Sequence, residues 1–308
     1  MIPALELGLL YSIVALGVYL TFRILNFPDL TVDGSFTTGA AVAASLLVSG
    51  TPPVLATLAG GLAGAIAGVI TGLLYSKGRI NGLLAGILTM IGLWSINLAI
   101  MGRSNIPMLR QETLMTPLRE NGLMGGPVSI LIFAIIALVL KFAIDWFLST
   151  DHGLGIQATG NNEEMIRSLG VNTSRMAIIT LALSNALVAL AGALIAQYQG
   201  FADISMGIGL VLVGLASVII GQAVIPARAV WWGTLAVILG AIIYRFVIFA
   251  ALAAGLDPNY MKLISAVLVV VALLLPRWGL LKRVPSLRQA FSGRATRPDL
   301  EKEVLESC

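Results

Sequence analysis

Nine apolar segments, separated by short polar stretches, run along almost the whole chain. A helix that crosses a membrane needs about 20 predominantly apolar residues. The segments are Leu5–Phe22, Phe36–Val48, Val54–Tyr75, Leu83–Met101, Val128–Phe147, Met176–Ala196, Ile208–Ile220, Val230–Ala250 and Met261–Leu275. Phe36–Val48 and Ile208–Ile220 are short, so we expect half-helices, tilted pieces or re-entrant segments there. The pattern predicts an all-α, polytopic transmembrane bundle of eight to ten spans, with nine as the best count.

A polar island at Gly153–Gly170 interrupts this pattern between two long apolar runs. Its first part, up to the turn residues Gly160 and Asn161, is typical of a loop. A helix of about two turns is expected next, with Asn161 or Asn162 as its N-cap and Gly170 at its end. Acidic residues in the first turn and an arginine near the end suit the helix dipole. Because so short a helix is unstable alone in water, it needs a protein surface on which to lie.

Composition supports the membrane assignment. The chain has 308 residues, of which 58% are hydrophobic and 11% are charged, against roughly 25% charged residues in soluble domains. Basic residues gather in the tail 281–308, which is therefore expected in the cytoplasm, with residues 1–280 as the membrane domain. Counting back through nine spans places the polar island on the same side and the loop Gly102–Pro127 outside. The basic sequence pI of about 9.4 follows this bias, and no nucleic-acid partner is expected.

Strongly polar groups beside apolar spans are candidates for a translocation pathway. The first hinge, Asn26–Ser35, contains the helix breakers Pro28 and Gly34. Irregular backbone at membrane depth is tolerated only where it faces protein or water. The hinge therefore either lines a pathway or is a cytoplasmic turn before a helix capped by Asp33 or Ser35. Its candidate residues are Asp29, Thr31, Asp33 and Ser35.

A second hinge, Gln199–Gly209, is rich in glycine and carries Asp203. Broken helices at corresponding places in two halves point to a transport site, although a solvated loop explains Asp203 as well. Within the spans, polar side chains either face a cavity or form hydrogen bonds between helices. These are Ser95, Asn97, Ser184 and Asn185. Arg245 must pair or reach toward the interface, and Lys141 and Asp145 are spaced for an ion pair within one helix.

No catalytic, nucleotide-binding or metal motif is present in the sequence. Gly155–Gly160 has the glycine spacing of a P-loop, but Asn161 and Asn162 stand where that motif requires Lys and Ser or Thr. One cysteine, Cys308, and one histidine, His152, exclude a disulfide framework and a multi-histidine site. We therefore expect neither an enzyme nor a bound cofactor. A pump without its own nucleotide site must use that of a partner.

The chain resembles permease subunits of bacterial ABC importers of the branched-chain amino-acid/ribose-type superfamily. The resemblance is carried by LNFPDLTVDGSFTTGAAVAA at Leu25–Ala44, GLGIQATGNNEEMIRSLGVN at Gly153–Asn172, LALSNALVALAGALIAQYQGFADISMGIG at Leu181–Gly209 and GLASVIIG at Gly214–Gly221. It covers almost the whole chain. The amino-acid sequences of the first and third stretches are similar to those of a subgroup associated with tryptophan and tyrosine uptake.

The resemblance implies that loop 151–172 contains a coupling helix, which sits in a groove of a separate ATPase subunit. By position, its contact residues are Thr159, Gly160, Asn161, Glu163, Glu164, Arg167, Ser168 and Gly170. It also implies two ATPase copies, a second permease chain (with a homodimer favoured), an external substrate-binding protein and a bacterial inner membrane. The solute would be an amino acid, and by the subgroup an aromatic one, moved by alternating access.

Two other classes remain as alternatives to an importer subunit. A stand-alone secondary transporter or channel would use Asp29, Asp33 or Asp203 as an ion site. A membrane enzyme that acts on lipids would need paired catalytic groups, and the sequence offers only scattered carboxylates and one histidine. Transport without any ATPase would distinguish the first of these from an importer subunit.

Overall fold

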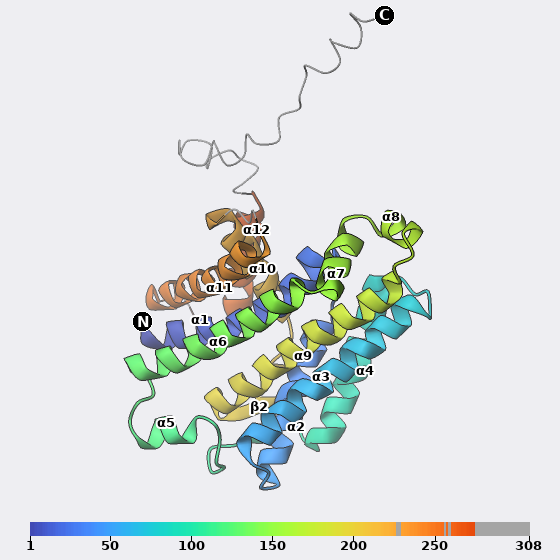
Figure 1. Cartoon of the computed structure of the whole chain (residues 1–308). Helices are drawn as coiled ribbons and strands as arrows, with labels where there is room; N and C mark the ends of the chain where they lie inside the picture. Colours follow the sequence, from blue (N-terminus) through green and yellow to red (C-terminus); the bar gives the residue numbers. More distant parts are fainter. Residues whose placement is uncertain (226–228, 256, 258–259, 275–308) are drawn as a thin grey trace, which may run out of the picture.

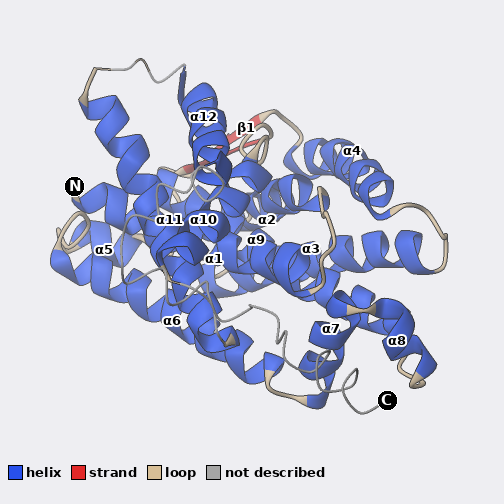
Figure 2. Ribbon diagram, turned by 90° about the horizontal axis from the view of Figure 1, so that it is seen from above, coloured by secondary structure: helices blue, strands red, loops and turns tan. Residues whose placement is uncertain are grey.

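A computed structural model describes residues 1–225, 229–255, 257 and 260–274 of the chain. The predicted tail 281–308 lies outside the described residues. Helices make up nearly all of the structure, with one two-stranded sheet (Figures 1 and 2). In chain order the elements are α1 (Ile2–Tyr19), η1 (Leu20–Ile24), α2 (Thr31–Val48), α3 (Pro53–Ser76), α4 (Gly82–Met101), β1 (Asn105–Pro107), α5 (Thr116–Glu120), α6 (Pro127–Leu148), α7 (Asp151–Asn161), α8 (Glu163–Ser168), α9 (Thr173–Gln199), β2 (Phe201–Asp203), α10 (Leu210–Val224), α11 (Val230–Ala253) and α12 (Met261–Leu274).

The prediction of an all-α, polytopic membrane bundle is confirmed. Among the described residues, seven helices are long and apolar enough to cross a membrane, and α10 is a shorter apolar helix. The segment Phe36–Val48, however, was predicted too short. α2 begins at Thr31 and has 18 residues. Its first turns carry polar side chains that are buried in protein, so counting apolar residues alone missed them.

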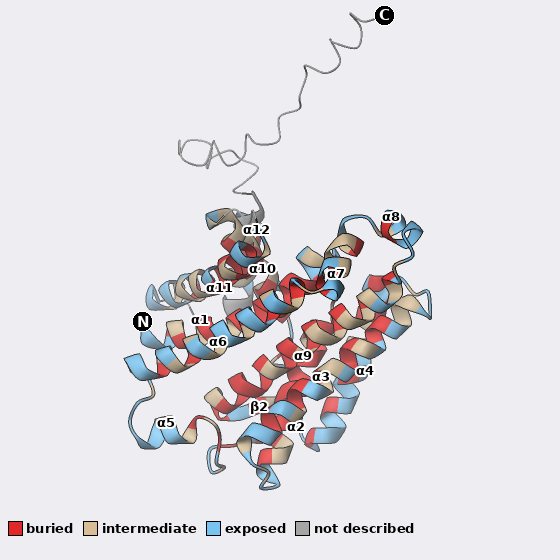
Figure 3. Ribbon diagram, in the orientation of Figure 1, coloured by how far each residue is buried: buried red, intermediate tan, exposed pale blue. Residues whose placement is uncertain are grey.

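The helices divide into an inner and an outer group. α1, α2 and α9 are mostly buried, whereas α4 and α6 turn one face outward (Figure 3). The outer faces carry large apolar side chains such as Leu88, Leu131 and Val139. In a membrane-spanning bundle, such faces are suited to lipid or to another helix.

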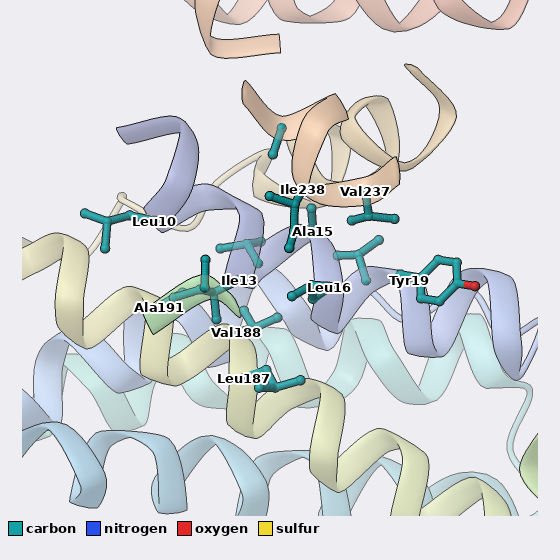
Figure 4. Close-up of a cluster of buried hydrophobic side chains, with 14 of the residues drawn as sticks. Leu10, Ile13, Ala15, Leu16, Tyr19, Leu187, Val188, Ala191, Val237 and Ile238 are labelled. Atoms are coloured by element: carbon teal, nitrogen blue, oxygen red, sulfur yellow. The ribbon is translucent and has the colours of Figure 1, made fainter. Parts of the chain in front are cut away.

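α1 is the centre of the largest hydrophobic cluster. Figure 4 shows Leu16 of α1 near Val188 of α9, with Val237 of α11 on the other side. All three side chains are completely buried. Since interiors are close-packed, these contacts fix α1 between the two other helices.

Glycines allow the closest approaches between helices. On α3, a methyl group at Gly68 would lie 2.2 Å from the carbonyl oxygen of Leu181 of α9. On α2, a methyl group at Gly39 would lie 1.9 Å from the carbonyl oxygen of Ala189 of α9. Small residues of this kind let helix backbones meet inside membranes. The α2–α3–α9 core is therefore a backbone-to-backbone contact.

The first hinge follows a local change of helix type. α1 runs into the π-helical turn η1, and regular structure ends at Ile24 and resumes at Thr31. Asn26 has φ +58°, a left-handed conformation that asparagine adopts more readily than most residues. π-helical turns interrupt α-helices mostly as single units, often at functional sites.

The polar island contains two helices rather than a loop followed by one helix. Residues 151–161 form α7, so the prediction of a loop there was wrong. The cause is local: the side chain of Thr150 accepts a hydrogen bond from the Gly153 amide and caps the helix. Glycines that would suit a turn are instead packed against neighbouring backbone. A methyl group at Gly153 would lie 2.3 Å from the Phe147 carbonyl oxygen.

A small sheet lies at the opposite end of the bundle from α8 (Figure 1). β1 and β2 pair antiparallel, with Ile106 opposite Ala202. The chain between α4 and α6 thus meets the segment that follows α9. From β2 the second hinge leads to α10.

Candidate functional site

α8 is a short helix fixed at both ends. The side chain of Asn162 accepts a hydrogen bond from the Met165 amide at 3.0 Å, so the predicted N-cap is confirmed. At the other end, Gly170 has φ +85° and Val171 donates its amide to the Ile166 carbonyl at 3.3 Å. This pattern is a Schellman motif, which confirms Gly170 as the end of the helix.

Side-chain bonds fasten α8 to the start of α9. Arg167 pairs with Glu163 at 2.7 Å, and the hydroxyl of Thr173 donates to the same carboxylate oxygen at 3.1 Å. Exposed ion pairs of this spacing contribute only about 0.3–0.5 kcal/mol. Their main effect here is to orient α8 relative to α9.

The eight residues predicted to contact an ATPase do not share one surface. Thr159 is buried, Gly160 is partly buried against the bundle, and Glu163 is partly covered by its bonds. The exposed members are Asn161, Glu164, Arg167, Ser168 and Gly170.

Sequence reasoning missed two exposed apolar side chains, one on the same short helix and one at the C-cap position directly after it. Met165 is 51% exposed and Leu169 is 70% exposed. They are four positions apart and therefore lie on one side of the helix. Two apolar residues at this spacing within a polar island were the available signal.

Gly160 joins this region to the first hinge. A methyl group at Gly160 would lie 1.9 Å from the carbonyl oxygen of Ile24, the last residue of η1. One turn earlier on α7, buried Ile156 packs in a cluster with Leu25 and Phe27. α7 therefore rests directly on the start of the hinge.

Asp29 lies in a buried polar cluster made by three parts of the chain. Its carboxylate accepts the Thr31 amide at 2.8 Å and the side-chain amide of Asn185 at 2.8 Å. The Thr31 hydroxyl in turn bonds to that of Thr71 at 2.8 Å. The structure thus brings Asp29, Thr31 and Asn185 together, and it links the hinge to α3 and α9.

Asp33 connects the two hinges. One carboxylate oxygen accepts the Gly209 amide and the other accepts the Val211 amide, each at 2.8 Å. Gly209 is the N-cap of α10 and has no side chain of its own for capping. Neither Asp33 nor Ser35 caps α2, so the expected cap at one of these residues was wrong. Asp33 instead satisfies the N-terminal amides of a helix from the other half of the chain.

A cavity of about 360 Å³ opens beside Asp33, between α2, α4 and the second hinge. Its lining residues are Asp33, Gly34, Thr37, Met90, Ile91, Trp94, Ser95, Asn97, Ile204 and Ile208. Asn97 donates its side-chain amide to the Gly34 carbonyl at 3.4 Å. In the part of the chain that the structure describes, the Oδ1 of Asn97 and the hydroxyl of Ser35 have no hydrogen-bond partner.

The remaining predicted pathway residues lie elsewhere. Ser184 is buried and donates to the Gly17 carbonyl at 2.7 Å, which is a bond between α9 and α1. Asp203 lies in β2 at the far end of the bundle, where it accepts bonds from Asn105 and Ser205. Partial burial acts to raise the pKa of the Asp203 carboxyl, but the hydrogen bonds outweigh it and lower that pKa below its usual value. Asp203 is therefore ionised at neutral pH.

Glu6 was missed by sequence reasoning, although it is almost completely buried. Its carboxylate accepts the Gly125 amide at 3.0 Å and the Tyr198 hydroxyl at 2.7 Å, and it also bonds to the hydroxyl of Ser129. A single carboxylate thus joins α1, α9 and the loop before α6. Its position near the start of an apolar run gave no sign of this role.

Three further charged side chains, Lys141, Asp145 and Arg245, lie among apolar helices. The predicted ion pair is confirmed, because Lys141 and Asp145 are 2.5 Å apart and both side chains are buried. The ammonium of Lys141 also lies 3.6 Å from the ring centre of Trp231 on α11. The guanidinium of Arg245 lies 3.5 Å from the ring centre of Tyr11 on α1. These cation–π contacts hold α11 against α6 and α1.

Within the described ranges, no group of three or more His, Cys, Asp or Glu side chains is placed to hold a metal ion. The site is therefore a set of hinges, a cavity and a short exposed helix. This arrangement would allow helices to move about the hinges and a small molecule to pass between them.

Comparisons with known proteins agree with this reading. The family described as "Branched-chain amino acid transport system / permease component" matches residues 2–273. The chain is 40% identical over 273 residues to a tyrosine transport system permease protein of Clostridioides difficile, which covers 88% of this chain and 90% of the relative. An uncharacterized protein of Rickettsia prowazekii is 37% identical and covers 89% of this chain and 96% of that protein.

A ribose import permease protein of Bacillus subtilis is 32% identical over 183 residues, which are 58% of this chain and 55% of the relative. No solved structure shows a significant match. The family match extends from the start of α1 almost to the end of α12 and includes the hinges, the cavity and α8. The chain therefore belongs to the family of permease components of branched-chain amino acid transport systems.

Proposed function

We propose that this chain is the membrane subunit of an ATP-driven importer in the bacterial inner membrane. Two copies of the chain would assemble with two ATPase subunits, and an external binding protein would deliver the solute. The solute is a small molecule of the amino-acid class, with an aromatic amino acid favoured by the name of the tyrosine-transport relative. Movement follows alternating access, in which the pathway opens to one side at a time.

The observation that carries the proposal is the contact between α7 and η1. α8 exposes polar and apolar side chains that suit a partner protein, and α7 connects it to the bundle. Gly160 brings the α7 backbone against the Ile24 carbonyl with no side chain between them. A push on α8 would therefore reach the hinge through rigid backbone contacts.

Further contacts continue this route into the bundle. From Ile24 the chain passes through the left-handed Asn26 to Asp29, which is bonded to α9 through Asn185. Four residues later, Asp33 holds the start of α10. The route thus ends beside the cavity that Asp33 lines.

The alternative, a transporter driven by an ion gradient alone, has less support. The carboxylates of Asp29 and Asp33 already accept hydrogen bonds from backbone amides or from Asn185. Asp203 lies at the opposite end from α8 and bonds to its own neighbours. The purified chain in liposomes with an ion gradient should therefore not transport without an ATPase. Uptake under those conditions would favour the alternative.

Charging the exposed apolar face of α8 should detach the ATPase. In M165D/L169D, two carboxylates would have to enter the partner's groove, where an unpaired charge is costly. Because a few residues usually carry most of the binding energy of an interface, we expect copurification of the ATPase and ATP-dependent import to fall at least roughly tenfold. Coexpression followed by affinity purification and quantitative mass spectrometry measures this loss.

The matched control for that pair is L109D, since Leu109 is 74% exposed and lies in the chain between β1 and α5, far from α8. It should leave the amount of bound ATPase unchanged. Equal ATPase recovery in M165D/L169D and in wild type would contradict the assignment of α8.

Adding one methyl group at Gly160 should uncouple hydrolysis from transport. In G160A the new methyl group cannot stay 1.9 Å from the Ile24 carbonyl, so α7 must move off η1. Overpacking of this kind costs about 1–3 kcal/mol. We expect the ATPase to remain bound while import per ATP falls about tenfold in proteoliposomes.

G155A is the control on the same helix, because its methyl group would meet only Met176, at an ordinary distance of 3.4 Å. Its import per ATP should match that of wild type. If G160A also transports normally, force does not pass through the α7–η1 contact.

A further inference from the structure

The tryptophans of the described residues fall into two kinds. Trp146 lies near the end of α6, and Trp231 and Trp232 lie at the start of α11. Helix ends at the membrane surface are where tryptophan is usually found, because its N–H meets water there. Trp94 instead lies well inside α4, although it is 43% exposed.

An indole N–H in lipid would lack a partner, which is unfavourable. In the part of the chain that is described, Trp94 makes no recorded hydrogen bond, and it lines the cavity beside Asp33. A half-exposed tryptophan at this depth is therefore better explained by a wet, solute-accessible space than by lipid.

The cavity has the size and the wall of a small-molecule site. Its volume of about 360 Å³ lies within the usual range of roughly 300–1,000 Å³ for ligand pockets. Most of the lining side chains are apolar, while Asp33 supplies a carboxylate and Ser95 a hydroxyl. A flat apolar group fits such a wall, and a positively charged group is favoured near Asp33.

Asn97 adds an acceptor at the same place. It is 1% exposed, and its Nδ2 group must face the Gly34 carbonyl because the oxygen could not donate there. Its Oδ1 is left without a partner in the described structure, shielded behind the cavity wall. A buried acceptor of this kind is normally satisfied. An N–H or O–H donor of a solute would satisfy it once the wall opens.

We infer that this cavity is a solute-binding site on the translocation pathway and that a flat side chain of the solute stacks on Trp94. The solute is a small ammonium-bearing molecule with an aromatic group. Trp94 determines specificity through ring contact, and Asn97 accepts a hydrogen bond from the solute. The inference depends on the proposed importer function and adds to it the place and the chemistry of recognition.

A cysteine scan tests whether the cavity is accessible to solute. Cys308 is the only cysteine, so C308S gives a cysteine-free background for W94C and V139C. Val139 is 59% exposed on α6, outside the cavity lining, and is the control for a side chain that is expected to face lipid. In vesicles that contain the coexpressed transporter, a charged thiol reagent should label W94C and not V139C. L-tyrosine should slow the labelling of W94C, and L-ribose should not.

Import measurements test specificity with the assembled complex and ATP. We expect W94A to lower the ratio of L-tyrosine to L-leucine import about three- to tenfold, in keeping with a ring contact. W94F should retain most of the ratio, and W146A, a tryptophan at the end of α6, should not change it.

A W94C that is as unreactive as V139C, or an unchanged ratio in W94A, would overturn this inference. Failure of the wild-type complex to import any amino acid with ATP would instead overturn the proposed function. The two failures are therefore distinguishable.

Discussion

Replacing Lys141 by methionine is expected to destabilise the protein by about 3–5 kcal/mol. The ammonium of Lys141 is fully buried, pairs with Asp145 and lies over the ring of Trp231. In K141M the carboxylate of Asp145 stays buried, and among the described residues only Thr234 is left to donate to it, at 2.8 Å. The loss of folded protein with temperature, followed by size-exclusion chromatography in detergent, measures the effect.

Two companion variants show whether burial is the cause. R167M removes the same type of pair at the same spacing, but on the exposed helix α8, and should cost less than about 1 kcal/mol. The double variant K141M/D145N removes both buried charges and should recover most of the stability lost in K141M. Equal losses of stability in K141M and R167M would show that burial of the pair on α6 does not increase the cost of breaking it.

Replacing Gly39 by alanine is expected to separate α2 from α9. The new methyl group would lie 1.9 Å from the Ala189 carbonyl oxygen and 2.7 Å from the Cα atom of Ala189, so the backbones themselves must shift. Inserting a group into a well-packed interior costs about 1–3 kcal/mol, and more where backbone cannot yield. We expect a lower melting temperature and little import, measured on the same detergent-purified complex.

G92A provides the contrast on α4. A methyl group there meets nothing within 4 Å, and alanine favours a helix over glycine by roughly 0.5–1 kcal/mol. G92A should therefore melt at the same temperature as wild type or slightly higher. If G39A behaves like G92A, then the close approach of α2 and α9 is not required.

The type and the approximate positions of the long elements could be predicted because spanning helices need long apolar runs, whereas seven of the nine expected spans are long enough to cross a membrane in the described residues. The caps of α8 were also predictable, since Asn162 and Gly170 act within a few residues of their own positions. α7 was missed because its glycines are typical of turns, whereas here they allow contact with backbone such as that of Ile24. Local rules therefore explain what could be predicted about the fold.

The candidate site was only partly predictable, because its main contacts join distant parts of the chain. Asp29 and Asp33 could be singled out as polar residues beside apolar spans. Their partners, Asn185 and the start of α10, could not, since nothing in the sequence near either residue encodes which helix will lie opposite. Glu6 and Trp94 were missed for the same reason.

The capping of α10 by Asp33 has a consequence for biogenesis. The amides that Asp33 accepts lie 176 and 178 residues further along the chain. During synthesis, α2 therefore enters the membrane long before its carboxylate finds these partners. Until the ribosome has synthesised the second half, the first half cannot complete its packing. During that time the carboxyl group of Asp33 lacks the two amides that it accepts in the folded protein.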